Sequence, residues 1–121
     1  MATVDLTTEN FERVVSGNDI VIVDFWAPWC GPCRSFGPTF EAASEKYPNI
    51  IFAKVNTEEN QDIAGYFSIR SIPTMMVFRE KIILYSEAGA LPAAALDNLI
   101  EQISAADMAA VHAEIAKQTD K

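Results

Sequence analysis

The residues best suited to chemistry in this chain are its two cysteines, Cys30 and Cys33, which are separated by a Gly-Pro dipeptide. The apolar run 20–25 before them is typical of a buried strand, and residues 34–47 read as a helix. A Cys-x-x-Cys pair at a strand-to-helix junction suits reversible disulfide chemistry. Unpaired N–H groups and the dipole of the helix N-terminus stabilise a thiolate there, so we expect Cys30 to be the exposed, reactive sulfur. Cys33 lies a turn deeper.

Two other uses of a cysteine pair fit less well. Zinc usually takes four sulfur or nitrogen ligands, whereas this chain offers two cysteines and one distant histidine, His112, so we expect no metal site. Inert core thiols are disfavoured because Gly31 and Pro32 favour a turn into a helix start, which exposes the first thiol. The pattern therefore favours redox chemistry.

Four further residues could belong to a functional site, and the sequence pattern alone leaves two interpretations open for each. Asp24 stands near the end of the apolar strand. It either hydrogen-bonds a loop, or is buried with a raised pKa and able to transfer a proton near neutral pH. Pro73 is either an ordinary turn proline or part of a site. Trp26 and Trp29 are either core aromatics or exposed contacts.

Composition limits the classes of partner. At 121 residues the chain is long enough for one domain with a real core, and half of its residues are hydrophobic. A net charge of −8 argues against nucleic acid and anionic membranes as partners, and no apolar stretch approaches the roughly 20 residues of a membrane span. The first residues lack the basic start and apolar middle of a signal peptide, so we expect a cytoplasmic protein.

The predicted elements alternate between helix and strand. Strands are expected at 20–25, 50–55, 74–78 and 82–85, with a short additional strand near 3–5, and helices at 34–47, after caps at 7–8 and 56–57, and from 91 to 103. This order predicts an α/β fold: a mixed sheet of four or five strands with helices on both faces. Pro38 should kink its helix. Glu80 and Lys81 accept positive φ poorly, so we expect a turn other than the tight two-residue type between the last two strands.

Residues 104–121 form an alanine-rich, helix-prone tail. Its apolar stripe, Met108, Val111 and Ile115, is rotated by roughly a quarter turn from the stripe of the preceding helix. One straight helix could not press both stripes on the same surface. We therefore divide the chain into a domain of residues 1–103 and a helical extension of residues 104–121, with a bend near 104–106 or a separate partner for the tail.

The segment Phe25–Cys33, with the letters FWAPWCGPC, closely resembles the signature of the thioredoxin family. Ile72-Pro73-Thr74, Lys54 and Gly89 also fall where that family has its matching elements. The resemblance covers about residues 4–103 and implies a thioredoxin-like fold. Ser71, where the family often has glycine, and the tail depart from the family pattern.

The resemblance also implies roles for individual residues. Cys30 would attack a substrate disulfide and Cys33 would break the mixed disulfide. Asp24, with Lys54 as its charged partner, would assist deprotonation of the resolving thiol. Pro73 would be a cis-proline opposite the cysteines, beside a backbone at Ile72 that pairs with substrate as an added strand. The implied substrate-binding residues are Trp29, Gly31, Pro32, Ile72, Pro73, Gly89 and Ala90, and the structural ones are Trp26 and Pro38.

The implied function is protein-disulfide reduction that contributes to cytoplasmic redox homeostasis. The resemblance implies no bound cofactor and disulfide-containing proteins as substrates. It also implies recharging by an NADPH-dependent flavoprotein thioredoxin reductase. A monomer is expected, with a weak dimer through the tail as the alternative state. A second function stays open: a thioredoxin-like docking or chaperone-associated module that binds a partner through the tail.

Overall fold

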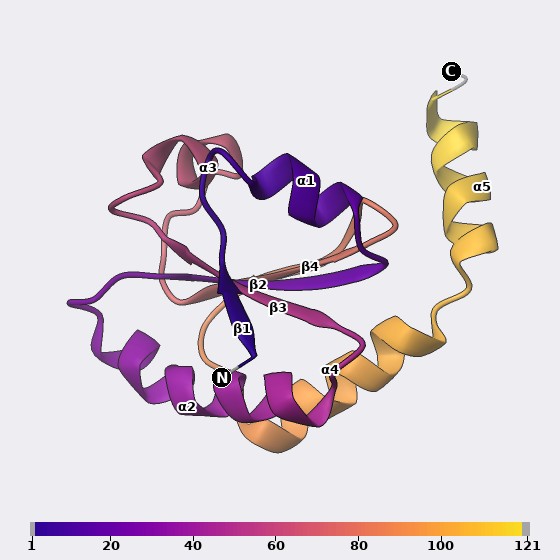
Figure 1. Ribbon diagram of the computed structural model, residues 1–121. Coiled ribbons are helices and arrows are strands. Elements are labelled where there is room, and N and C mark those ends of the chain that lie inside the picture. Colours follow the sequence, from indigo (N-terminus) through magenta and orange to yellow (C-terminus); the bar gives the residue numbers. More distant parts are fainter. Residues whose placement is uncertain (1, 120–121) are drawn as a thin grey trace.

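The computed structural model describes residues 2–119, which form five strands and five helices around one sheet (Figure 1). In chain order these are β1 Thr3–Asp5, α1 Phe11–Ser16, β2 Ile20–Trp26, α2 Gly31–Lys46, β3 Ile51–Asn56, α3 Gln61–Tyr66, β4 Thr74–Arg79, β5 Ile82–Ala88, α4 Ala93–Ala105 and α5 Met108–Thr119. The predicted fold class is confirmed, including the short first strand.

The sheet has the strand order β1-β3-β2-β4-β5. β2 lies at its centre, parallel to β3 on one side and antiparallel to β4 on the other. All residues of β2 except the last are buried, as expected for a strand covered on both faces. Because β2 leads directly into the loop that carries Cys30, the most buried strand positions the cysteine pair.

Two apolar clusters cover the two faces of the sheet. α2 and α4 pack on one face, where Ile22 of β2 and Phe52 of β3 contact them. α1 and α3 lie on the other face, over Val23 and Phe25. Side chains alternate between faces along a strand, so Asp24 shares the face of Ile22, which is the face that α2 covers (Figure 1).

The turn between β4 and β5 corrects a prediction. β4 ends at Arg79 and β5 begins at Ile82, and the two residues between them have positive φ, 52° for Glu80 and 70° for Lys81. This is a tight two-residue turn, so the prediction of a different turn type is wrong. Neighbouring segments hold the strained backbone in place: Glu80 N–H donates to Asp19 O at 2.8 Å, and the Glu80 carboxylate lies 2.7 Å from His112 Nε2.

Two helices begin later than their predicted caps. α1 starts at Phe11, because Thr7 and Asn10 hydrogen-bond each other's backbone N–H groups and close a turn first. α3 starts at Gln61, because the Asn56 side chain accepts from Glu58 N–H at 3.0 Å and holds another turn. In both places a short polar side chain stabilises a turn in competition with helix.

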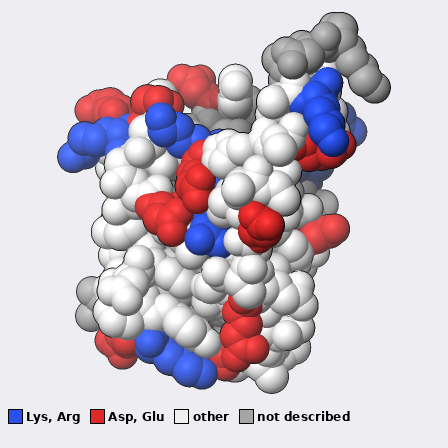
Figure 2. All heavy atoms as spheres, turned by 90° about the vertical axis from the view of Figure 1, so that its right-hand side faces the viewer, with Lys and Arg blue, Asp and Glu red and all other residues white. Residues whose placement is uncertain are grey.

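The tail leaves the body through a break in the helix. α4 ends at Ala105, Ala106 is extended with ψ 138°, and α5 starts at Met108, so the predicted bend is confirmed. Met108 is buried, but most of α5 is exposed and stands off the body at the end far from the start of α2 (Figure 1). Figure 2 faces this end and shows acidic and basic side chains interspersed over it.

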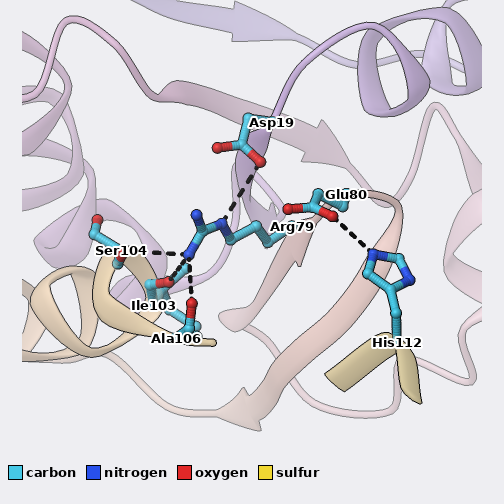
Figure 3. Close-up of polar contacts among 7 residues, drawn as sticks. All are labelled: Asp19, Arg79, Glu80, Ile103, Ser104, Ala106 and His112. Carbon is cyan, nitrogen blue, oxygen red and sulfur yellow. Dashed lines mark hydrogen bonds and ion pairs between the residues drawn. The ribbon is translucent and has the colours of Figure 1, made fainter. Parts of the chain in front are cut away.

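Arg79 fastens the end of α4 to the sheet (Figure 3). Its guanidinium donates to the carbonyl oxygens of Ile103, Ser104 and Ala106 at 2.7, 3.1 and 3.3 Å. Asp19 faces the same guanidinium, with 3.5 Å between its Oδ1 and Nε. One largely buried cation thus caps carbonyl groups that a helix C-terminus leaves without intrahelical partners.

Candidate active site

Cys30 is the N-cap residue of α2. Its backbone is extended, with φ −85° and ψ 113°, and its Sγ accepts a hydrogen bond from the backbone N–H of Cys33 at 3.2 Å. The two cysteines form a disulfide, with 5.2 Å between their Cα atoms. The N–H group of Cys33, in the first turn of the helix, therefore points at the sulfur of Cys30, which is an arrangement that stabilises a thiolate.

Both sulfur-bearing residues are buried in this disulfide form. Cys33 is 3% exposed, as expected, but Cys30 is only 5% exposed, so the expectation of an exposed Cys30 is wrong here. The reason is the loop before β4: the carbonyl oxygen of Ile72 lies 3.7 Å from Cys30 Sγ. This loop is distant in sequence, and no local pattern around the cysteines indicates that it covers them.

The loop that faces Cys30 is tied to the end of β5. The Ile72–Pro73 peptide bond is cis, and the Pro73 carbonyl accepts from Gly89 N–H at 2.8 Å. Gly89 has φ +111°, a conformation that other residues rarely adopt, so glycine is required to close this contact. Thr74 Oγ also donates to the carbonyl of Ser71. The structure thus brings Ile72, Pro73 and Gly89 together opposite the disulfide.

Trp29 forms an exposed rim beside the cysteines. It is 65% exposed, and its indole N–H donates to the Glu58 carboxylate at 2.9 Å. Sequence reasoning missed Glu58. The signal that could have found it is strand register: Trp26 of β2 pairs with Asn56 of β3, so the loops after these two parallel strands meet at one edge.

Asp24 is a fully buried carboxyl group. It is 0% exposed, and neither of its oxygens is hydrogen-bonded to any group within residues 2–119. Burial raises the pKa of Asp24 to about 7, although the positive charge of Lys54 opposes part of that rise. Asp24 and Lys54 are direct cross-strand partners. The ammonium of Lys54 lies 4.7 Å from the ring centroid of Trp26, a contact that sequence reasoning did not predict.

The remaining predicted site residues take simpler places. Gly31 and Pro32 form the exposed first positions of α2, and Pro38 lies inside that helix on its exposed side. Ala90 is exposed next to Gly89. Trp26 is half-buried at the end of β2.

Three further observations concern metal ions, membrane spans and surface grooves. Within residues 2–119, no group of three or more His, Cys, Asp or Glu side chains is arranged to hold a metal ion. No helix in the same range is both long and apolar enough to cross a membrane. A groove of about 500 Å³ lies between α1, α3 and the β4–β5 hairpin, and none of the predicted site residues lines it. The chemically capable residues gather at the disulfide instead.

A disulfide at the N-terminus of a helix that is faced by a cis-proline loop is the arrangement of a thiol–disulfide oxidoreductase, and the central strand before it carries a buried carboxyl group. Comparisons with known proteins agree. The chain belongs to the thioredoxin family, whose sequence model matches residues 2–102. Like other members with this cysteine pair, it is a protein-disulfide reductase, a class of protein that works with a reductase and disulfide substrates.

Relatives and solved structures give the extent of the similarity. The chain is 47% identical to putative thioredoxin 2 of Streptomyces coelicolor over 117 residues, covering 97% of this chain and 87% of the relative. It is 40% identical to thioredoxin of Porphyra purpurea, covering 84% of this chain and 97% of that protein. The structure of Plasmodium falciparum thioredoxin matches with a TM-score of 0.77 and 35% identity, covering 83% of this chain and 98% of that one. A mutant thioredoxin from Halobacterium salinarum matches with a TM-score of 0.78 and 31% identity, covering 84% of this chain and 89% of that one.

These matches differ in how much of this chain they cover. The Streptomyces relative aligns with 117 of the 121 residues and therefore with most of residues 104–121. The Porphyra protein and the two structures cover 83–84% of this chain, and the family model ends at residue 102. Most of the tail therefore aligns with the Streptomyces relative, and it lies outside the residues that the family model matches.

Proposed function

We propose that this protein is a general protein-disulfide reductase of the cytoplasm, in which Cys30 attacks the substrate and Cys33 resolves the mixed disulfide. The observation that carries this assignment is the hydrogen bond from Cys33 N–H to Cys30 Sγ at 3.2 Å. It gives Cys30, the N-cap residue, a donor for negative charge. Cys33 lies within the first turn of α2 and is buried, which suits a resolving thiol.

The reaction has two exchange steps. The Cys30 thiolate attacks one sulfur of a substrate disulfide, forms a mixed disulfide and expels the other substrate sulfur as a thiolate. Cys33 then loses its proton and attacks Cys30 Sγ, which forms the Cys30–Cys33 disulfide and releases the second substrate thiolate. Two electrons pass from the protein to the substrate, and the product is the disulfide form that the structure contains.

Asp24 is proposed to take the proton that Cys33 must lose. It lies on the face of the sheet that α2 covers, and its pKa of about 7 lets it exchange a proton near neutral pH. Lys54, its cross-strand partner, supplies the positive charge that favours the ionised form of Asp24.

Substrate is proposed to dock along the loop that faces the disulfide. The half-buried Ile72 offers backbone groups next to Cys30 for pairing with an extended peptide. Trp29 supplies an exposed aromatic surface on the rim, and the surroundings are lined with small or apolar groups, namely Gly31, Pro32, Gly89 and Ala90. The surface recognises backbone more than particular side chains, which suits a reductase of many proteins.

An NADPH-dependent flavoprotein thioredoxin reductase is proposed to return electrons to the disulfide, and the protein is proposed to act as a monomer that holds no cofactor. The test couples purified protein to a thioredoxin reductase, NADPH and insulin. We expect NADPH oxidation that requires both this protein and insulin. A chain that neither accepts electrons from the reductase nor reduces insulin when dithiothreitol replaces the reductase would exclude the proposal.

We also propose that residues 1–103 form the catalytic domain and residues 104–121 a separate extension that contacts a partner or a second copy; residues 1, 120 and 121 lie outside the described part. The observation that favours this second function is the exposure of α5 at the end far from α2 (Figure 1). A partner there would leave the disulfide open.

Truncation after Ser104 tests the second function. If the tail is a docking element, the truncated protein keeps insulin reduction but loses self-association in sedimentation velocity or a bound partner in pull-down. Equal association of both forms would exclude it. Loss of insulin reduction by a folded truncated protein would contradict the division into two units.

A further inference from the structure

Three side chains of the active-site region share one face of the sheet. Asp24 and Trp26 are two residues apart on β2, and side chains at that spacing point to the same face. Lys54 is the direct partner of Asp24 on β3, so its side chain emerges on that face too. Lys54 therefore starts beside the carboxyl group of Asp24 and can reach either toward it or along the strand toward Trp26.

The ammonium of Lys54 is held by the indole ring. Its Nζ lies 4.7 Å from the ring centroid of Trp26, within the range of a cation–π contact, for which tryptophan is the best partner. No carboxylate within residues 2–119 forms an ion pair with Lys54 at 4.0 Å or less. The ring is thus the contact that fixes where this charge lies.

The main chain at Trp26 is firmly held, and the half-buried indole ring extends from it. The carbonyl oxygen of Trp26 accepts two hydrogen bonds from Thr57, from its N–H at 2.9 Å and from its hydroxyl at 3.1 Å. A lysine side chain is flexible and its ammonium is strongly hydrated, so without the ring the charge would move into water. The indole has two rotatable side-chain bonds on this held main chain, so Trp26 is the less flexible partner of the pair and Lys54 the more flexible one.

We propose that Trp26 is a positioning residue: its indole ring holds the Lys54 ammonium beside the buried Asp24 carboxyl group and thereby favours the ionised form of Asp24. This inference rests on the proposed proton transfer by Asp24. Trp26 then has a role beyond its structural one, because it influences proton transfer by Asp24 through the position of Lys54.

Few other charges face Asp24. β2 holds no second ionisable side chain, and the partner of Asp24 on β4 is the apolar Met75. At the start of α2, Cys30 and Cys33 do not titrate as a disulfide, and the remaining charged side chain, Arg34, is exposed to solvent. On α4, Asp97 is engaged by Lys46 at 2.9 Å. In the oxidised protein the titration of Asp24 therefore reports mainly on Lys54 and on hydration.

The test follows the carboxyl ¹³C shift of Asp24 against pH in the oxidised full chain. Four proteins form a double-mutant cycle: wild type, Trp26→Leu, Lys54→Met and the double variant. Removing the ring also lets water reach Asp24, which lowers the midpoint, and the Lys54→Met background measures this effect alone. We therefore compare the change in midpoint that Trp26→Leu causes in the two backgrounds. This change should be about half a pH unit more positive with Lys54 present than with Met at position 54, which corresponds to an approximately threefold change in the protonation equilibrium.

Trp26→Phe keeps an aromatic face and disturbs the fold less, so it tests the same point if the leucine variant is unfolded by its amide spectrum. The Asp24 midpoint of Trp26→Phe should be closer to the wild-type midpoint than that of Trp26→Leu is. Its shift from wild type should also depend on whether Lys54 is present. Equal shifts with and without Lys54 would overturn the positioning role, for either variant. Reduction of insulin by Asp24→Asn is measured separately. If that variant keeps the wild-type rate while the cycle shows coupling, the proton role of Asp24 fails and the positioning role of Trp26 stands.

Discussion

Asp24 and Lys54 lie directly opposite each other on β2 and β3, yet the Lys54 ammonium rests over Trp26 and the Asp24 oxygens have no hydrogen-bond partner within residues 2–119. A buried carboxyl group with so little compensation is costly to ionise. The protein retains it at the centre of its sheet, on the face that α2 covers. Replacing Asp24 should therefore stabilise the folded protein and at the same time slow disulfide reduction.

The first prediction concerns stability against pH. The pKa of Asp24 is about 7 in the folded protein and near the ordinary value of 3.8 in the unfolded chain. Below pH 3.8 both states hold the proton; between 3.8 and 7 only the folded state holds it, so raising the pH favours unfolding. This group alone should cost about 2–3 kcal/mol of folding free energy between about pH 5 and pH 8. Asp24→Asn should remove that loss.

Urea denaturation of wild type and Asp24→Asn at several pH values measures this difference. Asp62→Asn, a substitution of an exposed aspartate on α3, is the matched control and should follow the wild type. Parallel curves for wild type and Asp24→Asn would show that Asp24 is not titrating in this range.

The second prediction concerns the rate of disulfide reduction. Asn at position 24 cannot accept the proton of Cys33, so the resolving step should slow by about 10²-fold or more near pH 7, the lower end of general-base contributions. The defect should shrink as the pH rises, because more Cys33 is then deprotonated by solvent. Stopped-flow reduction of insulin between about pH 6 and pH 9 measures this profile. A rate equal to that of wild type over the whole range would remove Asp24 from the mechanism.

The third prediction concerns substrate docking at Trp29. Trp29→Ala removes a 65% exposed aromatic surface beside Cys30 and should lower kcat/KM for insulin by about tenfold, or about 1.4 kcal/mol. Tyr66→Ala is the matched control, because Tyr66 is 82% exposed but lines the groove between α1, α3 and the hairpin. Equal losses in both variants would point to a general effect of exposed aromatics.

The fourth prediction separates the tail from the chemistry. Arg79→Met leaves three carbonyl oxygens at the end of α4 without their charged donor and should cost about 1–3 kcal/mol of folding free energy. Hydrogen exchange of amides in α5 should accelerate, while insulin reduction by the folded variant stays unchanged. Arg13→Met, at an exposed position of α1, is the control. A slower reduction rate in the folded Arg79 variant would show that the tail and the active site are coupled.

Local patterns predicted much of this protein. The buried strand β2 and the helix start at the cysteine pair follow from residue types that permit few other structures, whereas the residues alone left the burial of Asp24 open. Lys54 was paired with Asp24 by resemblance, and the strand register agrees. These features depend on short segments and on one strand pairing, which a sequence pattern represents well.

The features that escaped prediction depend on contacts between distant segments. Glu80 and Lys81 accept positive φ because Asp19 and His112 hold the turn, and neither residue is near in sequence. Cys30 is buried because Ile72 lies over its sulfur. The Lys54 ammonium lies over an aromatic face and not against a carboxylate, which depends on side-chain placement that no periodicity encodes.

The order of attack by the two cysteines is the central claim, and trapping of the mixed disulfide tests it most directly. Cys33→Ser and Cys30→Ser proteins, each reduced, are mixed with a disulfide-bonded protein such as insulin and examined by intact mass under acid quench. Cys33→Ser should accumulate a stable adduct of insulin joined to Cys30 by a mixed disulfide, because the thiol that breaks it is absent. Cys30→Ser should form little adduct. An adduct that forms as readily on Cys33, or no adduct on either cysteine, would contradict the assignment.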